Sequence, residues 1–357
     1  MSASPGIAQP INGTPVSGEV EPQAPNEAES GDDERRRRRR RFLVLFLLLG
    51  AFLVLFGLAI WYLLFRQPIP VPVIPGETIM PGYQTSIYGA ARPMGVAVSP
   101  DGARIYVGAT DGDRTARVFD AQGNQIALMQ PPKSTGTDHT PVYLAIDPLT
   151  GEVYVTYRPT GSIYVYDANG TYQRTYTSKV PDQSWQPLGI AFDKAGNLYV
   201  TDVGNSPQRV LEIDRSGNVV RTIGESANLS FPNGLAADDA GYLYVTDSNN
   251  GRLVVFAPNG TIAAQVGRGV SEGALGLPRG VAIDGQGRVY VGDATGQGVF
   301  VYGVLKTGEQ RLDYLGFFGG EGVANGKFEY PNGVAADARG RLYVADAMND
   351  RVQLWSY

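Results

Sequence analysis

The sequence predicts an all-β domain of six four-stranded antiparallel units, preceded by one transmembrane helix. Two observations carry this prediction. From Arg92 onward, a pattern of small, apolar and turn-forming residues recurs six times at a spacing of about 46 residues, which is typical of repeat folds. Ahead of these repeats, residues 42–65 are uncharged and overwhelmingly apolar, and a helix of that length crosses a hydrocarbon core of roughly 30 Å.

The first 41 residues are predicted to form a disordered cytoplasmic tail. Few of their side chains are large and apolar, so they cannot bury enough surface to offset the entropy of ordering. The tail ends in an unbroken arginine run from Arg35 to Arg41. Because positive charge beside an apolar span stays on the cytoplasmic side, this run predicts a membrane anchor with the repeats outside the cell.

The C-terminal end of the apolar span has sequence features that also indicate a membrane anchor. Trp61 and Tyr62 suit the outer membrane interface, where aromatic side chains gather. A cleaved signal peptide is the alternative, but the apolar stretch is too long and no cleavage site of small residues follows Phe65. Residues 66–81 include QPIPVPVIPG, whose alternating prolines favour an extended, stiff stalk.

Composition limits the chemistry of the exported part. From Gln67 onward there are 22 Lys and Arg residues and 28 Asp and Glu residues, and this acidic balance argues against nucleic acid as a partner. The chain has no cysteine, which excludes disulfides and thiolate chemistry. Such a composition is more usual for a bacterial surface protein than for a secreted eukaryotic one.

Each repeat contains the signals for four strands. A small-residue strand comes first, a strand with a Tyr-Val pair comes second, and two further strands follow. The copies begin at Arg92, Thr140, Gln186, Phe231, Leu277 and Tyr330. Six such sheets around one axis predict a six-bladed β-propeller of four-stranded antiparallel blades.

The last copy has signals for only three strands before the sequence ends. The segment GYQTSIYGA, at residues 82–90, lies directly before the first copy and matches the fourth-strand pattern NVVRTIG of an earlier copy. We expect this segment to complete the last blade, because joining the two ends of the ring removes exposed sheet edges. The predicted propeller therefore spans residues 82–357.

The repeat resembles the NHL repeat of β-propellers, whose pattern is PxGVAxDxxGxxYVxDxxNxRV. The stretches FPNGLAADDAGYLYVTDSNNGRLVVF, at residues 231–256, and YPNGVAADARGRLYVADAMNDRVQLW, at residues 330–355, follow it well. The resemblance implies a six-bladed fold for residues 82–357. It implies little about function, because such propellers include scaffolds, sensors and a few enzymes.

Residues that recur in every copy are interpreted as structural, and residues that break the pattern as candidates for function. Asp202, Asp247, Asp293 and Asp346 recur three residues after the Tyr of the second strand. A carboxylate in this place accepts backbone N–H groups of the following turn. These four aspartates are therefore predicted to be structural.

The residue before the recurrent glycine of the first strand breaks the pattern. In chain order it is Met94, Val142, Leu188, Asn233, Arg279 and Asn332, and Tyr143 replaces the glycine of the second copy. Gluconolactonase-like propellers, to which the chain is distantly similar, bind a divalent cation at the channel mouth with Glu, Asp and Asn. Two asparagines fit that ligand set, but no carboxylate occurs at this position, and the charge of Arg279 opposes a cation.

Four aromatic residues lie at or near the starts of strands, Trp185, Phe231, Phe328 and Tyr330. An apolar residue precedes Pro in several copies, which favours filling of the clefts between blades. A recognition patch is the alternative interpretation.

We therefore predict Asn233, Arg279 and Asn332 as ligand-binding residues, and no catalytic residue, metal or cofactor. The single histidine, His139, excludes multi-histidine zinc chemistry and suits a solvated loop better than a Ser-His-Asp triad. The predicted function is a single-pass membrane protein whose extracellular propeller binds a protein or glycan ligand at the cell surface. A metal-dependent hydrolase of the gluconolactonase kind is the alternative.

Overall fold

The structure is a computed structural model that describes residues 27–65, 80–133, 139–176, 179 and 185–357. It consists of two compact units, Met1–Gln67 and Pro68–Tyr357, each of which is described by itself. The predicted tail up to residue 26 and nearly all of the predicted stalk lie outside the described residues.

The described part of the first unit is the helix α1 (Glu27–Phe65). Within it, Arg35–Leu58 has a mean hydropathy of 2.6 and is long and apolar enough to serve as a membrane anchor or a signal sequence. The helix begins at Glu27 rather than at the predicted residue 42, so residues 27–41 are helical where a disordered tail was predicted. Arginine is a good helix former, which favours continuation of the helix through residues 35–41. Arg35 and Arg41 are exposed, whereas the side chains of Trp61 and Tyr62 lie outside the described part.

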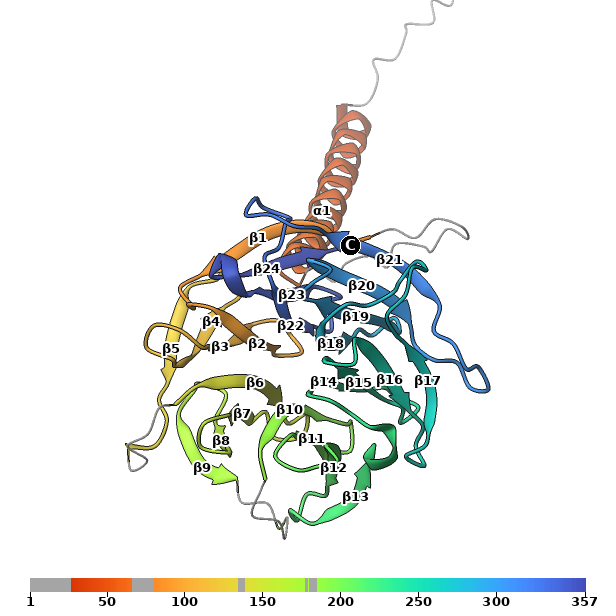
Figure 1. The fold of residues 1–357 in the computed structure, drawn as a ribbon. Coiled ribbons are helices and arrows are strands. Elements are labelled where there is room, and N and C mark those ends of the chain that lie inside the picture. Colours follow the sequence, from red (N-terminus) through yellow and green to blue (C-terminus); the bar gives the residue numbers. More distant parts are fainter. Residues whose placement is uncertain (1–26, 66–79, 134–138, 177–178, 180–184) are drawn as a thin grey trace, which may run out of the picture. The chain divides into compact units, whose positions relative to one another are not determined.

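The second unit is a ring of six four-stranded antiparallel sheets, which confirms the predicted six-bladed β-propeller (Figure 1). In five blades the strands follow chain order from the axis outward. Blades one to three contain β2 (Pro93–Val98), β3 (Arg104–Ala109), β4 (Ala116–Asp120), β5 (Gln125–Met129), β6 (Pro141–Ile146), β7 (Val153–Tyr157), β8 (Ser162–Tyr166), β9 (Tyr172–Tyr176), β10 (Pro187–Phe192), β11 (Leu198–Asp202), β12 (Arg209–Ile213) and β13 (Val219–Ile223). Blades four to six contain β14 (Pro232–Ala237), β15 (Leu243–Asp247), β16 (Arg252–Phe256), β17 (Ile262–Val266), β18 (Pro278–Ile283), β19 (Arg288–Asp293), β20 (Gly298–Gly303), β21 (Tyr314–Gly319), β22 (Pro331–Ala336), β23 (Leu342–Asp346) and β24 (Arg351–Ser356). The 3-10 helices η2 (Glu225–Ala227) and η3 (Ala347–Asn349) lie in loops.

The sixth blade is completed by β1 (Gly82–Tyr88), as the sequence predicted. This strand pairs antiparallel with β24, so that Tyr88 faces Arg351 and Gly82 faces Ser356. The sheet order is β1-β24-β23-β22. The two ends of the repeat array therefore share one sheet, and the ring is closed.

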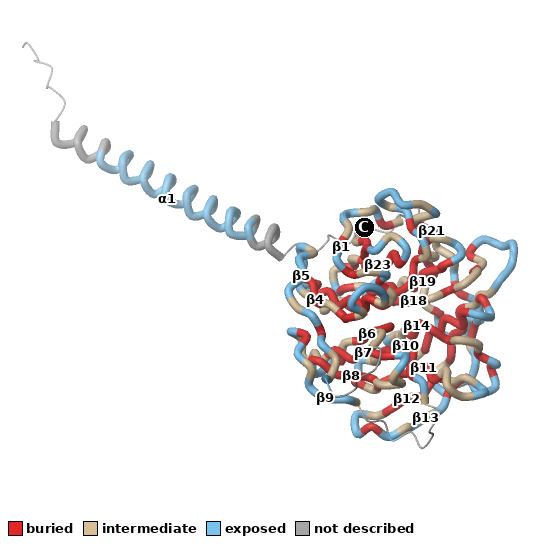
Figure 2. The backbone as a smooth tube through the Cα atoms, turned by 60° about the vertical axis from the view of Figure 1, so that its left-hand side comes forward, coloured by how far each residue is buried: buried red, intermediate tan, exposed pale blue. Residues whose placement is uncertain are grey.

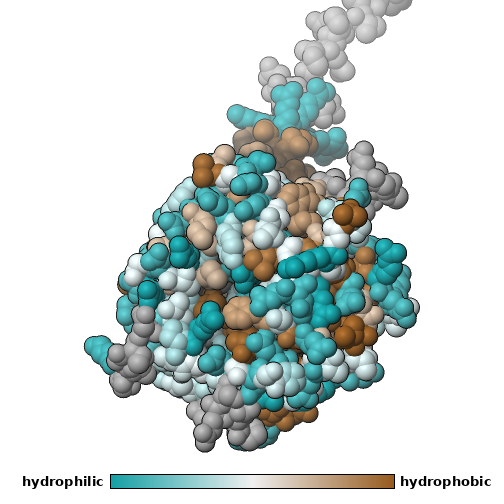
Figure 3. All heavy atoms as spheres, viewed as in Figure 1, coloured by the Kyte–Doolittle hydropathy of each residue, from teal (hydrophilic) through white to brown (hydrophobic). Residues whose placement is uncertain are grey.

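The core lies between neighbouring blades rather than at one centre. Figure 2 shows buried residues on the inner strands and exposed residues on the outer ones. The Tyr of the second strand is fully enclosed in four copies, at 0–1% exposed for Tyr106, Tyr244, Tyr290 and Tyr343. Figure 3 shows hydrophilic residues over much of the propeller surface in view, with hydrophobic residues in separate small groups.

Glycine is required where the innermost strands meet. A Cβ on Gly234 would lie 2.6 Å from the carbonyl oxygen of Arg279, and one on Gly280 would lie 2.6 Å from that of Asn332. Such distances are too short for any side chain, so the recurrent glycines set how closely the blades approach the axis.

Two faces of the ring follow from the strand directions. The six innermost strands all begin with a proline on one face, which we name the proline face. They end on the other face, where an aspartate follows in five of the six copies, and we name this the aspartate face. Because Gly82 of β1 pairs with the last residue of β24, the chain joins the ring on the aspartate face.

Candidate functional site

The axis is closed at its proline end by Tyr143. The Tyr143 hydroxyl donates a hydrogen bond to Asn332 Oδ1 at 2.8 Å and lies 3.4 Å from Asn233 Oδ1. Asn332 Nδ2 in turn lies 3.3 Å from Met94 Sδ. Burial raises the pKa of Tyr143, so its hydroxyl stays protonated and remains a donor. One side chain that breaks the repeat thus links three blades across the axis, and Asn332 extends the link to a fourth.

The three predicted ligand-binding residues lie together at this end, but in different environments. Asn233 and Asn332 are 2% and 0% exposed. Both asparagines contact Tyr143, and Asn233 Nδ2 also donates to the Phe231 carbonyl at 3.0 Å. Their amide groups are therefore engaged within the protein.

Arg279 is the charged member of this group. It is half-buried, its Nη2 donates to the Tyr330 hydroxyl at 2.5 Å, and its guanidinium lies 5.4 Å from the centre of the Tyr330 ring. Its Nε is buried without a hydrogen-bond partner, and no carboxylate of the described residues forms an ion pair with it. Arg279 therefore places a positive charge without an acidic partner at the proline end of the axis.

Three residues with large side chains on this face have a left-handed backbone conformation. Arg92, Phe231 and Tyr330 each precede the proline of an innermost strand and have φ angles of 45°, 54° and 58°. Each backbone N–H is held by a side-chain oxygen from the preceding blade. The pairs are Arg92 with Asp350 at 2.7 Å, Phe231 with Gln208 at 2.5 Å, and Tyr330 with Gln297 at 2.8 Å.

Of the four aromatic residues predicted near strand starts, Trp185 is half-buried against the cluster that contains Val142 and Leu188. The other three are of two kinds. Phe328 is 0% exposed and stacks on Trp355 with ring centres 5.5 Å apart, so it fills a cleft between blades. Phe231 and Tyr330 are half-buried, and each lies under an arginine. For Phe231 this is Arg158, whose guanidinium lies 5.0 Å from the ring centre. The proline face therefore presents paired arginine and aromatic side chains.

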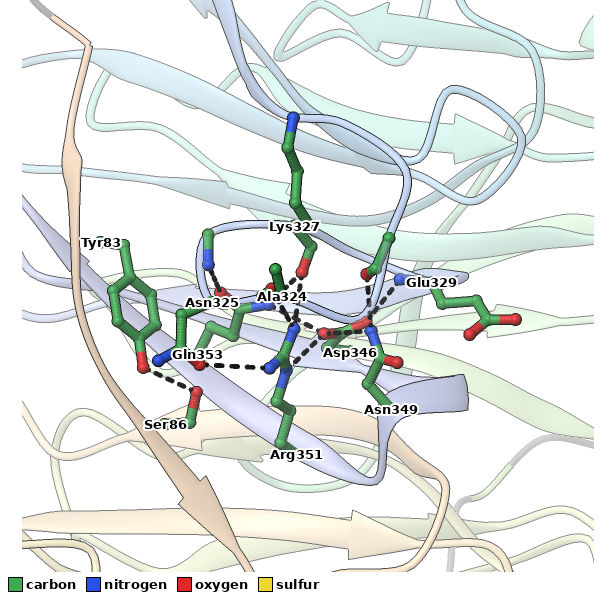
Figure 4. Close-up of polar contacts among 12 residues, drawn as sticks. Tyr83, Ser86, Ala324, Asn325, Lys327, Glu329, Asp346, Asn349, Arg351 and Gln353 are labelled. Atoms are coloured by element: carbon green, nitrogen blue, oxygen red, sulfur yellow. Dashed lines mark hydrogen bonds and ion pairs between the residues drawn. The ribbon is translucent and has the colours of Figure 1, made fainter.

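The four recurrent aspartates hold this face in place. Each is fully buried and accepts a backbone N–H from the segment that leads into the innermost strand of its own blade. For Asp346 the donor is Glu329 at 2.7 Å, and the same carboxylate pairs with Arg351 at 2.8 Å (Figure 4). Asp202 and Asp247 pair with Arg209 and Arg252, whereas Asp293 binds backbone N–H groups and Thr295. All four carboxylates are thus bound within the protein, as a structural role would require.

Potential metal ligands are not grouped at the axis. Within the described ranges, no set of three or more His, Cys, Asp or Glu side chains is placed to hold a metal ion. The His139 ring packs edge-on against Tyr157, with ring centres 5.9 Å apart, and His139 is the only histidine of the chain.

Comparisons with known proteins agree with this architecture. Residues 229–256 match the NHL repeat, and no curated protein matches the chain. A streptogramin B lyase structure covers 79% of this chain and 99% of its own, at 14% identity and a TM-score of 0.54. A catalytically inactive histidine-to-alanine variant of virginiamycin B lyase from Staphylococcus aureus, with quinupristin, covers 77% and 100%, at 15% identity and a TM-score of 0.53.

A protein of unknown function from Bacteroides thetaiotaomicron covers 78% of this chain and 72% of its own, at 18% identity and a TM-score of 0.57. Identities this low show a common fold and no common activity. The chain is a six-bladed β-propeller that carries an NHL repeat.

Proposed function

We propose that the chain is a single-pass membrane protein whose propeller uses its proline face to bind a protein or glycan ligand outside the cell. The observation that carries this proposal is the left-handed backbone of Arg92, Phe231 and Tyr330. Such a conformation costs about 1–3 kcal/mol for each non-glycine residue, and it clusters at functional sites. Here it recurs at one position in three blades and is held in each by a side chain from the neighbouring blade.

The side chains on this face suit a binding surface. Arginine and aromatic residues are enriched among the residues that contribute most to protein interfaces. Arg92 and Arg158 are exposed, and Phe231 and Tyr330 are partly exposed. The uncompensated charge of Arg279 favours a ligand with an acidic group near the axis.

The point at which the chain enters the ring agrees with use of the proline face. β1 starts on the aspartate face, opposite the proposed binding surface. The gluconolactonase-like alternative gains no support, because Arg279 lies where that chemistry needs a cation and Asn233 and Asn332 are engaged with Tyr143.

A crosslinking experiment on intact cells tests this proposal. Because the chain has no cysteine, a single cysteine can carry a photoreactive maleimide. Pro159→Cys places it on the proline face beside Arg158, and Ser216→Cys places it on an aspartate-face turn, both at exposed positions. We expect a ligand adduct from position 159 and little from position 216.

Two arginine variants test which face contributes to the adduct, and removal of metal ions tests the metal-dependent alternative. Arg158→Gln in the Pro159→Cys background is expected to lower the adduct yield severalfold, whereas Arg311→Gln, the same charge change on the aspartate face, is expected to leave it unchanged. EDTA is also expected to have no effect. Equal adducts from both positions contradict the proposal, and loss of the adduct in EDTA favours the metal-dependent alternative.

A further inference from the structure

A cavity of about 300 Å³ runs along the axis between the innermost strands of all six blades, which face one another around the axis in Figure 1. Tyr143 and Asn233 lie at its proline end, where their contacts close it. Toward the aspartate face it continues into a wider hollow of about 610 Å³, and the two share five lining residues, Ile146, Pro148, Phe192, Ala237 and Ile283. The axis is thus a blind cavity with its mouth on the aspartate face.

The walls of this cavity are apolar in every blade. The first wall position is Val96, Leu144, Ile190, Leu235, Val281 and Val334, each 6–7% exposed. The next position is alanine in all six copies, and the third, nearest the mouth, is a larger apolar residue in four copies and alanine at positions 237 and 336. The volume corresponds to on the order of ten water molecules. Walls of this kind suit an apolar group of that size.

The mouth of the cavity is polar and unevenly charged. In three blades the carboxylate that follows the innermost strand is paired with an arginine. The pairs are Asp147 with Arg215 at 3.5 Å, Asp284 with Arg288 at 2.7 Å, and Asp337 with Arg341 at 2.7 Å. These three sectors of the mouth are therefore close to neutral.

The sectors of blades three and four differ from these three in charge. Asp193 and Asp238 both line the mouth. In the part of the chain that the structure describes, no lysine or arginine pairs with either, and their carboxylates accept N–H groups of their own turns instead. Lys194, the nearby cation at the mouth, is paired with Asp239 at 2.6 Å. This side of the mouth therefore carries net negative charge.

We propose that this cavity binds a small organic cation with an apolar body, of the alkylammonium class. The apolar body lies between the innermost strands, and the ammonium lies at the mouth against Asp193, Asp238 and Asp239. The negative mouth excludes a carboxylate with the same tail, because that charge would face unpaired acidic groups. This site lies on the opposite face from the protein or glycan site and is independent of it.

A homologous series of probes tests the proposal. Binding of propylammonium, butylammonium, pentylammonium and hexylammonium is measured by calorimetry on the full-length protein in nanodiscs, with empty nanodiscs subtracted. We expect the affinity to rise about fourfold for each added methylene, as for burial of an apolar group. Hexanoate is expected to bind at least about tenfold more weakly than hexylammonium.

Two variants locate the binding. Ala237→Phe fills the cavity near its mouth with the residue that the preceding copy already has there, Phe192, and is expected to weaken hexylammonium binding at least about tenfold. Asp239→Lys introduces the residue found at the equivalent place in that copy, Lys194, and is expected to weaken binding about fivefold. Glu272→Lys, the same charge change in a loop of the proline face, is expected to leave it unchanged.

Four results would overturn the proposal. Absence of hexylammonium binding, or an affinity independent of tail length, shows that the cavity takes no apolar group. Hexanoate binding as tightly as hexylammonium shows that the mouth does not select a cation. Equal effects of Asp239→Lys and Glu272→Lys show that the cation binds elsewhere. If Ala237→Phe does not fold, the two lysine variants still decide the question.

Discussion

Replacing Asp346 by Ala is expected to lower the free energy of unfolding of the propeller by about 3–5 kcal/mol. Asp346 is 0% exposed and Arg351 is 4% exposed, so the substitution leaves a buried guanidinium without its counter-charge. The same carboxylate also accepts hydrogen bonds from the Glu329 backbone at 2.7 Å and from the Gln353 side chain at 2.8 Å (Figure 4). All of these partners lose their acceptor together.

Urea unfolding of a fragment that starts at Met80 measures this change. The matched control is Asp239→Ala, which removes an exposed pair with Lys194 whose side chains are 75% and 79% exposed. We expect the control to cost less than about 1 kcal/mol, because solvent screens exposed ion pairs. A loss for Asp346→Ala as small as that of the control would show that the buried network does not stabilise the blade.

The second large loss of stability is expected where β1 pairs with β24 and closes the ring. Ile87 on β1 is 5% exposed, faces Val352 on β24 and packs in the cluster that contains Val96 and Phe119. Ile87→Asp places an unpaired carboxylate in this cluster, and we expect it to cost about 3–5 kcal/mol. Because β1 joins the two ends of the repeat array, its release opens the last blade.

Gln84→Asp on the same strand is the control, because Gln84 is exposed. Its expected cost is within about 0.5 kcal/mol. Limited proteolysis gives a second readout, since β24 becomes an edge strand when β1 is released, and we expect cleavage near the C-terminus in the Ile87→Asp variant. Similar unfolding and proteolysis for the two variants would contradict the role of β1 as the closing strand.

The fold was predictable from the sequence because repetition supplies its own alignment. Six copies of one pattern gave the blade number and the strand order, and the missing fourth strand identified residues 82–90 as its substitute. The start of α1 at Glu27 was not predicted, since the arginine run was interpreted by its charge alone although arginine also favours helix.

The candidate site was less predictable, for two physical reasons. The contact between Tyr143 and Asn332 joins residues 189 positions apart, and nothing in either local sequence indicates which end of the axis it closes. The replacement of glycine by Tyr143 was the available signal. The cavity on the aspartate face was missed because its walls consist of residues that recur, and recurrence was taken as a sign of purely structural roles.

We propose above all that an apolar helix anchors the chain in a membrane and that the propeller lies outside the cell. Single-cysteine labelling with a membrane-impermeant maleimide tests it most directly, because the chain has no cysteine of its own. One variant, Ser17→Cys, lies before the arginine run, and the other, Ser271→Cys, lies at an exposed position of the propeller. The account predicts that intact cells label position 271 and that position 17 is labelled only after lysis. Labelling of position 17 in intact cells with position 271 protected, or a mature protein that lacks position 17 altogether, would contradict it.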